Sequence, residues 1–196
     1  MARRVFEFVE PDRFVAGTVG EPGQRAFFLQ ARAGARTTSV ALEKAQVAAL
    51  AERVTALLDS LLRRSGGDVP IPALTPVDQL DLDPLEAPVD EEFRVGSMSL
   101  EWDDDNLQFV LEAFAVVPES EGSDDDVDVD SLDALDSDED GPDKLRVVLT
   151  GAAARHFAER AERVVAAGRP PCPFCNQPLD PDGHICPRQN GHRRRA

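Results

Sequence analysis

The sequence predicts an α+β fold, in which an antiparallel sheet packs against two amphipathic helices and a small zinc-binding segment follows. Three observations lead to this prediction. Short apolar runs fill residues 5–42, and turns rich in proline and glycine separate them. Residues 47–62 and 154–165 instead repeat apolar side chains at intervals of three and four, which is typical of helices. All three cysteines lie between residues 172 and 186.

Four strands are expected in the first 42 residues, because β-branched and aromatic residues recur there between turn signals. The clearest turn is the tetrapeptide EPGQ at residues 21–24, where proline and glycine supply the dihedral angles of a hairpin. An antiparallel meander is the simplest arrangement of these strands. The expected strands are residues 5–8, 14–19, 26–33 and 38–42.

A helix of about five turns is expected next, with Gly66 beyond its end as a typical stop signal. One face of this helix is entirely apolar, so we expect it to lie on the preceding sheet. The apolar positions are Val47, Leu50, Ala51, Val54, Leu57, Leu58, Leu61 and Leu62.

The strand pattern then resumes, with strands expected at 93–102, 107–117 and 145–149 and a turn at 103–106. A second helix should follow the last of these strands, with Thr150 as its N-terminal cap. Its apolar positions are Ala154, Phe157, Ala158, Ala161, Val164 and Val165.

The two strand–helix units resemble each other. When residues 40–58 are placed over residues 147–165, several apolar positions and the tripeptide Ala-Glu-Arg coincide. This match predicts an internal duplication, with two halves packed about a pseudo-twofold axis. The alternative is convergence, since any strand that leads into an alanine-rich amphipathic helix has a similar pattern.

Composition divides the chain into a body at 1–167 and a zinc-knuckle tail at 170–192. Within the body, residues 66–90 are rich in proline and are expected to form a flexible linker across the surface. Residues 119–143 hold most of the net charge of −16 and no basic residue. We expect this acidic insert to be disordered. An EF-hand calcium site is not expected there, because Ser131 and Ser137 stand where that loop needs glycine and glutamate.

The cysteine cluster predicts a structural zinc site. Cys172 and Cys175 have the two-residue spacing at which two thiolates bind one ion, and Cys186 supplies a third. A fourth protein ligand would close the tetrahedron and leave no open position for a catalytic water. Residues 170–192 contain too few apolar groups for a core, so we expect metal binding to provide their folding free energy.

Two histidines are candidates for the fourth ligand. His184 lies two residues before Cys186, so on an extended segment both side chains share one face. His192 lies six residues after Cys186 in a polar, arginine-flanked tail. We favour His184, because the turn at Gly183 positions it well. The predicted ligand set is Cys172, Cys175, His184 and Cys186.

Other features limit the classes of function. The sequence has no apolar stretch long enough for a membrane span, and its odd cysteine count argues against a disulfide framework, so we expect a cytoplasmic protein. Nucleic acid could contact the arginines near the end of the chain, but the acidity of the protein and its single tryptophan disfavour this partner. These arginines are Arg188, Arg193, Arg194 and Arg195.

Three segments together resemble an actinobacterial family of unknown function: RAFFLQAR with SVALEKAQVAALAERV, EEFRVGSMSLEW, and the closing CPFC with GHICPRQNGHRR. The resemblance covers nearly the whole chain except the acidic insert. It implies a conserved cytoplasmic role and assigns no catalytic residue. Genes of this family tend to lie near a histidine-phosphatase-like protein and a phosphoinositide-kinase-like protein, which implies a link to phosphate metabolism or signalling.

Three functions follow as hypotheses, and the last of them is a purely structural subunit of a larger complex. The first is a non-catalytic zinc-containing adaptor that binds another protein, because no nucleophile, phosphate-binding loop or acid–base pair is recognisable and His156 is expected at the edge of the core. The second is an enzyme or small-ligand binder with a site between the two halves. The residues considered for that site are Arg25, Gln30, Arg32, Glu43 and Arg94.

Overall fold

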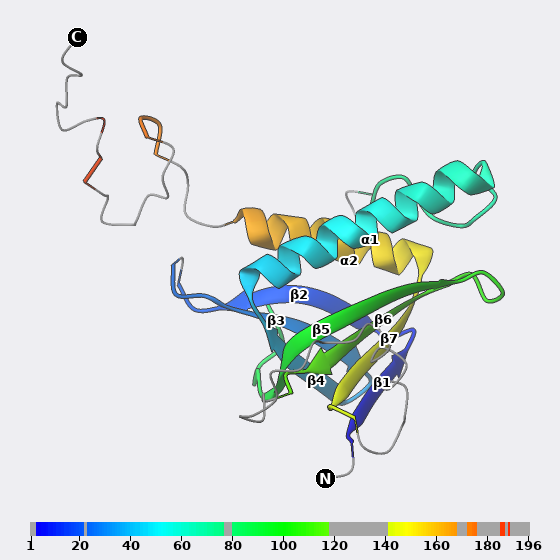
Figure 1. Cartoon of the computed structure of the whole chain (residues 1–196), viewed down its shortest axis with the longest axis horizontal. Helices are drawn as coiled ribbons and strands as arrows, with labels where there is room; N and C mark the ends of the chain where they lie inside the picture. The colour runs from blue at the N-terminus through cyan, green and yellow to red at the C-terminus, as the bar shows by residue number, and fades with distance from the viewer. Residues whose placement is uncertain are drawn as a thin grey trace, which may run out of the picture.

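A computed structural model shows a mixed sheet covered on one face by two helices (Figure 1). The structure describes residues 3–21, 23–76, 80–117, 141–167, 172–175, 185, 186 and 188. The strands are β1 (Val5–Val9), β2 (Arg13–Val19), β3 (Ala26–Ala33), β4 (Arg36–Leu42), β5 (Glu91–Asp103), β6 (Gln108–Ala115) and β7 (Lys144–Thr150). The helices are α1 (Lys44–Ser65), which follows β4, and α2 (Gly151–Ala166), which follows β7.

The strand order is β1-β7-β6-β5-β4-β3-β2. The meander expected in the first part of the chain is confirmed for β2, β3 and β4, and β5, β6 and β7 form a second one. The sheet as a whole is not antiparallel, however, because β4 pairs with β5 and β1 pairs with β7 in parallel. Strand β1 therefore does not join its neighbours in sequence. Its partner β7 is far along the chain, which local patterns cannot reveal.

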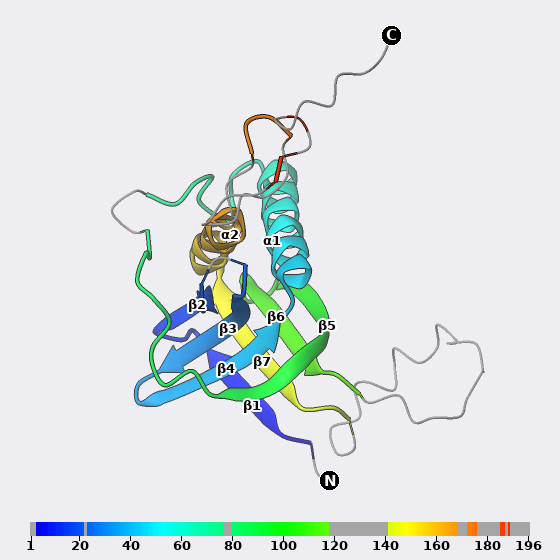
Figure 2. The ribbon, with the colours of Figure 1, turned by 90° about the vertical axis from the view of Figure 1, so that its left-hand side faces the viewer.

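The two edge strands of this order are joined by only three residues, 10–12, so the sheet must curl until its ends approach each other (Figure 2). Contacts across the seam agree with this closure. Arg36, at the start of β4, donates a hydrogen bond to the carbonyl oxygen of Glu7 on β1. Its guanidinium also lies 4.0 Å from the centre of the Phe8 ring.

The same sequence of elements occurs twice: three antiparallel strands and a helix in β2-β3-β4-α1, and again in β5-β6-β7-α2. The parallel pairs repeat as well. The beginning of β5 lies parallel to β4, which precedes α1, and β1 lies parallel to β7, which precedes α2. This arrangement agrees with the internal duplication expected from the sequence.

The end of α1 and the beginning of α2 lie where the sequence predicts them. The Gln46 side chain accepts a hydrogen bond from the Glu43 amide at 2.8 Å before α1, and Gly66 ends α1 in the left-handed region at φ 63°. Thr150 caps α2, because its hydroxyl accepts a hydrogen bond from the Ala153 amide at 3.2 Å. The apolar faces then complete the core with the inward side chains of the sheet.

The helices run antiparallel to each other across the sheet. Thr55 on α1 donates a hydrogen bond to Glu162 on α2 at 3.2 Å, and Arg155 on α2 contacts Asp59 on α1 at 2.6 Å. The beginning of α1 therefore lies beside the end of α2. Neither helix, within the described part of the chain, is long and apolar enough to cross a membrane.

Between α1 and β5, the described residues 66–76 and 80–90 run along the body and contact it closely. Ile71 is only 6% exposed, and a Cβ atom on Gly151 would stand 2.5 Å from its side chain. Gln30 on β3 binds the backbone of Glu86 in both directions, donating to its carbonyl at 3.0 Å and accepting from its amide at 2.8 Å. The acidic insert lies outside the described residues up to position 140. In its last part, Asp143 accepts a hydrogen bond from the Arg4 amide at 2.9 Å.

Candidate metal centre

The three cysteines converge on one point. The Sγ atoms of Cys172, Cys175 and Cys186 all lie within 4.8 Å of one another. The distance between the Sγ atoms of Cys172 and Cys186 is 3.9 Å, well beyond the length of a disulfide bond. Two ligands at about 2.3 Å from a tetrahedral zinc ion stand about 3.8 Å apart, so the observed spacing fits a shared metal.

The same segment buries two of its three thiols, leaves Cys175 half-buried and exposes two apolar side chains. Cys172 and Cys186 are 5% and 3% exposed, whereas Phe174 and Ile185 are 54% and 85% exposed. The Arg188 guanidinium donates a hydrogen bond to the Phe174 carbonyl at 3.0 Å, which holds this cation at the backbone of Phe174. The segment thus combines a potential metal site with an exposed apolar and cationic surface.

The predicted fourth ligand is not placed by the structure. His184 and its alternative His192 both lie outside the described residues, as do Arg193, Arg194 and Arg195. Among the described residues, the three cysteines alone form a group of metal-ligating side chains.

A second cluster joins β2, α2 and the segment before β5. Arg160 on α2 is 6% exposed and contacts an Asp81 carboxylate oxygen at 2.6 Å. The same carboxylate accepts from Arg13 on β2 at 2.6 Å. Arg160 also donates to the backbone carbonyl of Ala16 at 3.0 Å. One carboxylate therefore joins the buried Arg160 and the half-buried Arg13, which come from different halves.

The arginines control the protonation of this carboxylate. Partial burial of Asp81 raises the pKa of its carboxyl, but the hydrogen bonds from Arg13 and the charge of Arg160 outweigh this effect and hold the pKa below its usual value. Burial in turn lowers the pKa of Arg160. A cavity of about 210 Å³ adjoins the cluster, and His156 lines it together with Arg13 and Arg160.

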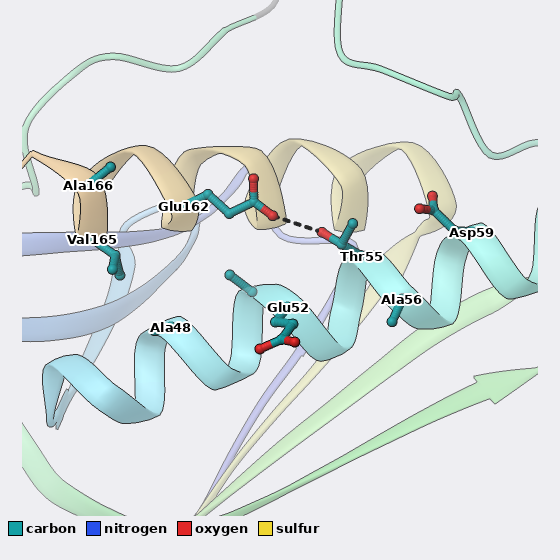
Figure 3. A pocket seen from close by; sticks show the side chains of 9 residues that line it. Ala48, Glu52, Thr55, Ala56, Asp59, Glu162, Val165 and Ala166 are labelled. Atoms are coloured by element: carbon teal, nitrogen blue, oxygen red, sulfur yellow. Dashed lines mark hydrogen bonds between the residues drawn. The ribbon is translucent and has the colours of Figure 1, made fainter.

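A third feature is an apolar groove between the two helices (Figure 3). It has a volume of about 450 Å³. Three carboxylates line it, and no basic side chain does. The apolar lining is made of Ala48, Ala51 and Ala56 from α1 and of Val165 and Ala166 from α2, and the carboxylates are Glu52, Asp59 and Glu162. In the following text this feature is called the helix groove.

The five residues considered for a ligand site between the halves make contacts with neighbouring segments. Gln30 and Arg32 both contact Glu86, while Glu43 and Arg94 form an exposed ion pair at 3.2 Å. Arg25 donates to the Ala167 carbonyl at 2.8 Å, at the end of α2. A ligand site at these five residues stays a prediction.

Sequence reasoning missed the cluster at Asp81 and the helix groove. The pattern of the second helix gave one indication of the cluster. Arg155 and Arg160 lie next to apolar-face positions of α2, where a buried arginine needs an acceptor. The identity of that acceptor could not be inferred, since Asp81 is 79 residues away from Arg160. His156 lies at the edge of the core, half-buried, as expected.

These features define an α+β protein built from two similar strand–helix halves and extended by a cysteine cluster suited to a metal ion. The chain belongs to a family described as "Protein of unknown function (DUF3090)", whose model matches residues 6–186. The match includes both halves and all three cysteines. No curated protein and no solved structure matches the chain.

Proposed function

We propose that this protein is a non-catalytic, zinc-dependent adaptor of the cytoplasm that binds a partner protein through its C-terminal segment. One observation carries the proposal: three thiols converge within 4.8 Å while Phe174 and Ile185 beside them are exposed to solvent. Large exposed apolar side chains are typical of surfaces that recognise other proteins. Arg188 adds a cation to this surface and favours a partner that is apolar with acidic groups nearby.

Zinc is the metal that best suits this donor set. Three thiolates and one imidazole form a common closed tetrahedral zinc site. His184 is the proposed fourth ligand, and the family match supports this choice because it includes position 184 and ends before His192. Structural zinc contributes roughly 10–16 kcal/mol of apparent binding free energy at neutral pH, which is enough to fold a segment with few apolar side chains.

The adaptor proposal can be tested by affinity capture from native lysate with two types of variant. Phe174→Ser with Ile185→Ser removes the exposed surface and leaves the metal ligands intact, whereas Cys172→Ser with Cys175→Ser removes the metal site. We expect that neither variant captures the specific partner that the wild-type protein captures. Val116→Ser with Val117→Ser, which replaces exposed apolar residues elsewhere, is the matched control. Identical partners for all forms would contradict the proposal.

A second candidate function is the binding of a small polar ligand between the two halves, with phosphate compounds as the first probes. The supporting observation is the cavity of about 210 Å³ beside Arg13, His156 and Arg160. Calorimetric titration with inorganic phosphate and with nucleotides tests it. Binding that is lost in His156→Ala supports this candidate, and no heat of binding with any of the probes contradicts it.

A further inference from the structure

The helix groove and the C-terminal segment complement each other in shape and charge. The groove offers an apolar lining of small side chains beneath a rim of carboxylates. The segment offers the exposed apolar side chains of Phe174 and Ile185 with the Arg188 guanidinium beside them. An apolar surface with a cation matches an apolar groove with acidic edges, since burial of apolar area and ion pairing then act together.

The connection between the two surfaces has a suitable length. The groove is bounded by Val165 and Ala166 at the end of α2, and the chain continues from there to Cys172. The five residue steps from Ala167 to Cys172 span up to about 17 Å when extended. The part of α1 that lines the groove, from Ala48 to Asp59, is about 16 Å long. Phe174 can therefore reach any point of the groove in its own chain.

The groove has acceptors that remain available for such a contact. Glu52 and Glu162 on its rim are both exposed. Glu162 accepts a hydrogen bond from the Thr55 hydroxyl at 3.2 Å through one of its two carboxylate oxygens (Figure 3). Asp59, in contrast, is already paired with Arg155 at 2.6 Å. The cation of an occupant would thus meet Glu52 and Glu162.

We infer that the helix groove is the docking site of the protein's own metal-bound C-terminal segment, with Phe174 and Ile185 against the alanines and Arg188 at the acidic rim. Docking covers the surface that the proposed adaptor function offers to a partner, so a partner must compete with the groove. The inference rests on the proposed function in two respects, the competing partner protein and the bound metal ion. The covalent connection between the segment and α2 makes docking favourable, because the tethered segment is present at a high effective concentration near the groove.

Photocrosslinking tests this inference in the full-length, zinc-loaded protein. Position 174 is replaced by p-benzoylphenylalanine, the dilute protein is irradiated, and crosslinked peptides are identified by mass spectrometry. We expect crosslinks within one chain to residues 48–59 of α1 or 162–166 of α2. The same photoreactive residue at Val5, which is 47% exposed on β1, is the control and should give none. Crosslinks only between two chains, or none to these helical peptides, would overturn the inference.

Charge reversal at the rim provides a second, independent readout. Glu52→Lys with Glu162→Lys should abolish most of the intrachain crosslink, whereas Glu101→Lys, at an exposed position on β5, should leave it unchanged. Equal crosslink yields in all three forms would contradict the predicted contacts. Zinc content is measured in each sample. Protein with zinc but no crosslink overturns the docking alone, and protein that binds no zinc overturns the proposed function.

Discussion

The Sγ atoms of Cys172 and Cys186 lie 3.9 Å apart although the two residues are fourteen positions apart in the sequence. Both side chains are buried in a segment where Phe174 and Ile185 are exposed. Apolar side chains would be expected inside if the hydrophobic effect organised this segment. The inverted arrangement is what the proposed metal site would produce, because the thiols rather than the apolar side chains would then organise the segment.

The first prediction concerns the exposed pair on this segment. Phe174→Ser with Ile185→Ser should leave the zinc content within error of the wild-type value, because neither side chain is buried around the thiols. Elemental analysis measures this quantity. A loss of zinc would mean that these side chains form a core around the thiols, and the surface assigned to a partner would not exist.

The second prediction concerns the carboxylate that joins two arginines. Asp81→Asn should lower the free energy of unfolding by roughly 2–3 kcal/mol, since it leaves Arg13 and Arg160 without their shared counter-charge. The estimate is below the value for a fully buried pair because the Asp81 side chain is 31% exposed. Urea unfolding provides the measurement. Asp83→Asn is the matched control, because Asp83 contacts these arginines through its backbone carbonyl, and its effect should be small.

The third prediction is the dependence of this contribution on pH. The pKa of Asp81 is lowered in the folded protein, so its contribution is complete above the pKa of the unfolded state and disappears as the pH falls through the folded pKa. Arg146 and Lys144 likewise lower the pKa of Glu112 against the opposing effect of its burial, so the wild type should lose stability in acid at several sites. The difference in unfolding free energy between wild type and Asp81→Asn should therefore shrink in acid. A difference that stays constant from neutral to strongly acidic pH would argue against the ion cluster.

The fourth prediction tests the close approach of the segment before β5 to the beginning of α2. Gly151→Ala should destabilise the protein by about 1–3 kcal/mol, because the new Cβ atom would stand 2.5 Å from the Ile71 side chain. In an Ile71→Ala background the same change should cost much less, since the obstructing atoms are gone. A double-mutant cycle of urea unfolding measures this coupling. Equal costs in both backgrounds would show that Ile71 does not pack there.

Local signals were sufficient to predict the helices. The apolar repeat, Gly66 after α1 and the Thr150 cap of α2 are all read from adjacent residues, and the structure confirms them. The turns within the two meanders are local in the same way. The parallel partners of β1 and β5 could not be predicted. The pairing of Val5 with Lys144, for example, depends on how the whole sheet closes, and no local pattern in either strand indicates it.

The candidate sites show the same contrast. The cysteine cluster was predicted because metal ligands have characteristic spacings, and the structure brings the three thiols together. The fourth ligand stays a prediction. The cluster at Asp81 has no such spacing, because Arg13, Asp81 and Arg160 come from three distant segments and meet only in the folded protein.

X-ray absorption spectroscopy at the zinc edge of the purified full-length protein tests the central claim most directly. One zinc ion per chain is expected, with three sulfur ligands at about 2.3 Å and one nitrogen ligand at about 2.0 Å. His184→Ala should remove the nitrogen ligand from the spectrum, whereas His192→Ala should leave the spectrum unchanged. A protein that binds no stoichiometric metal, or a zinc ion with only oxygen and nitrogen ligands, would contradict the proposal that these cysteines form a metal centre.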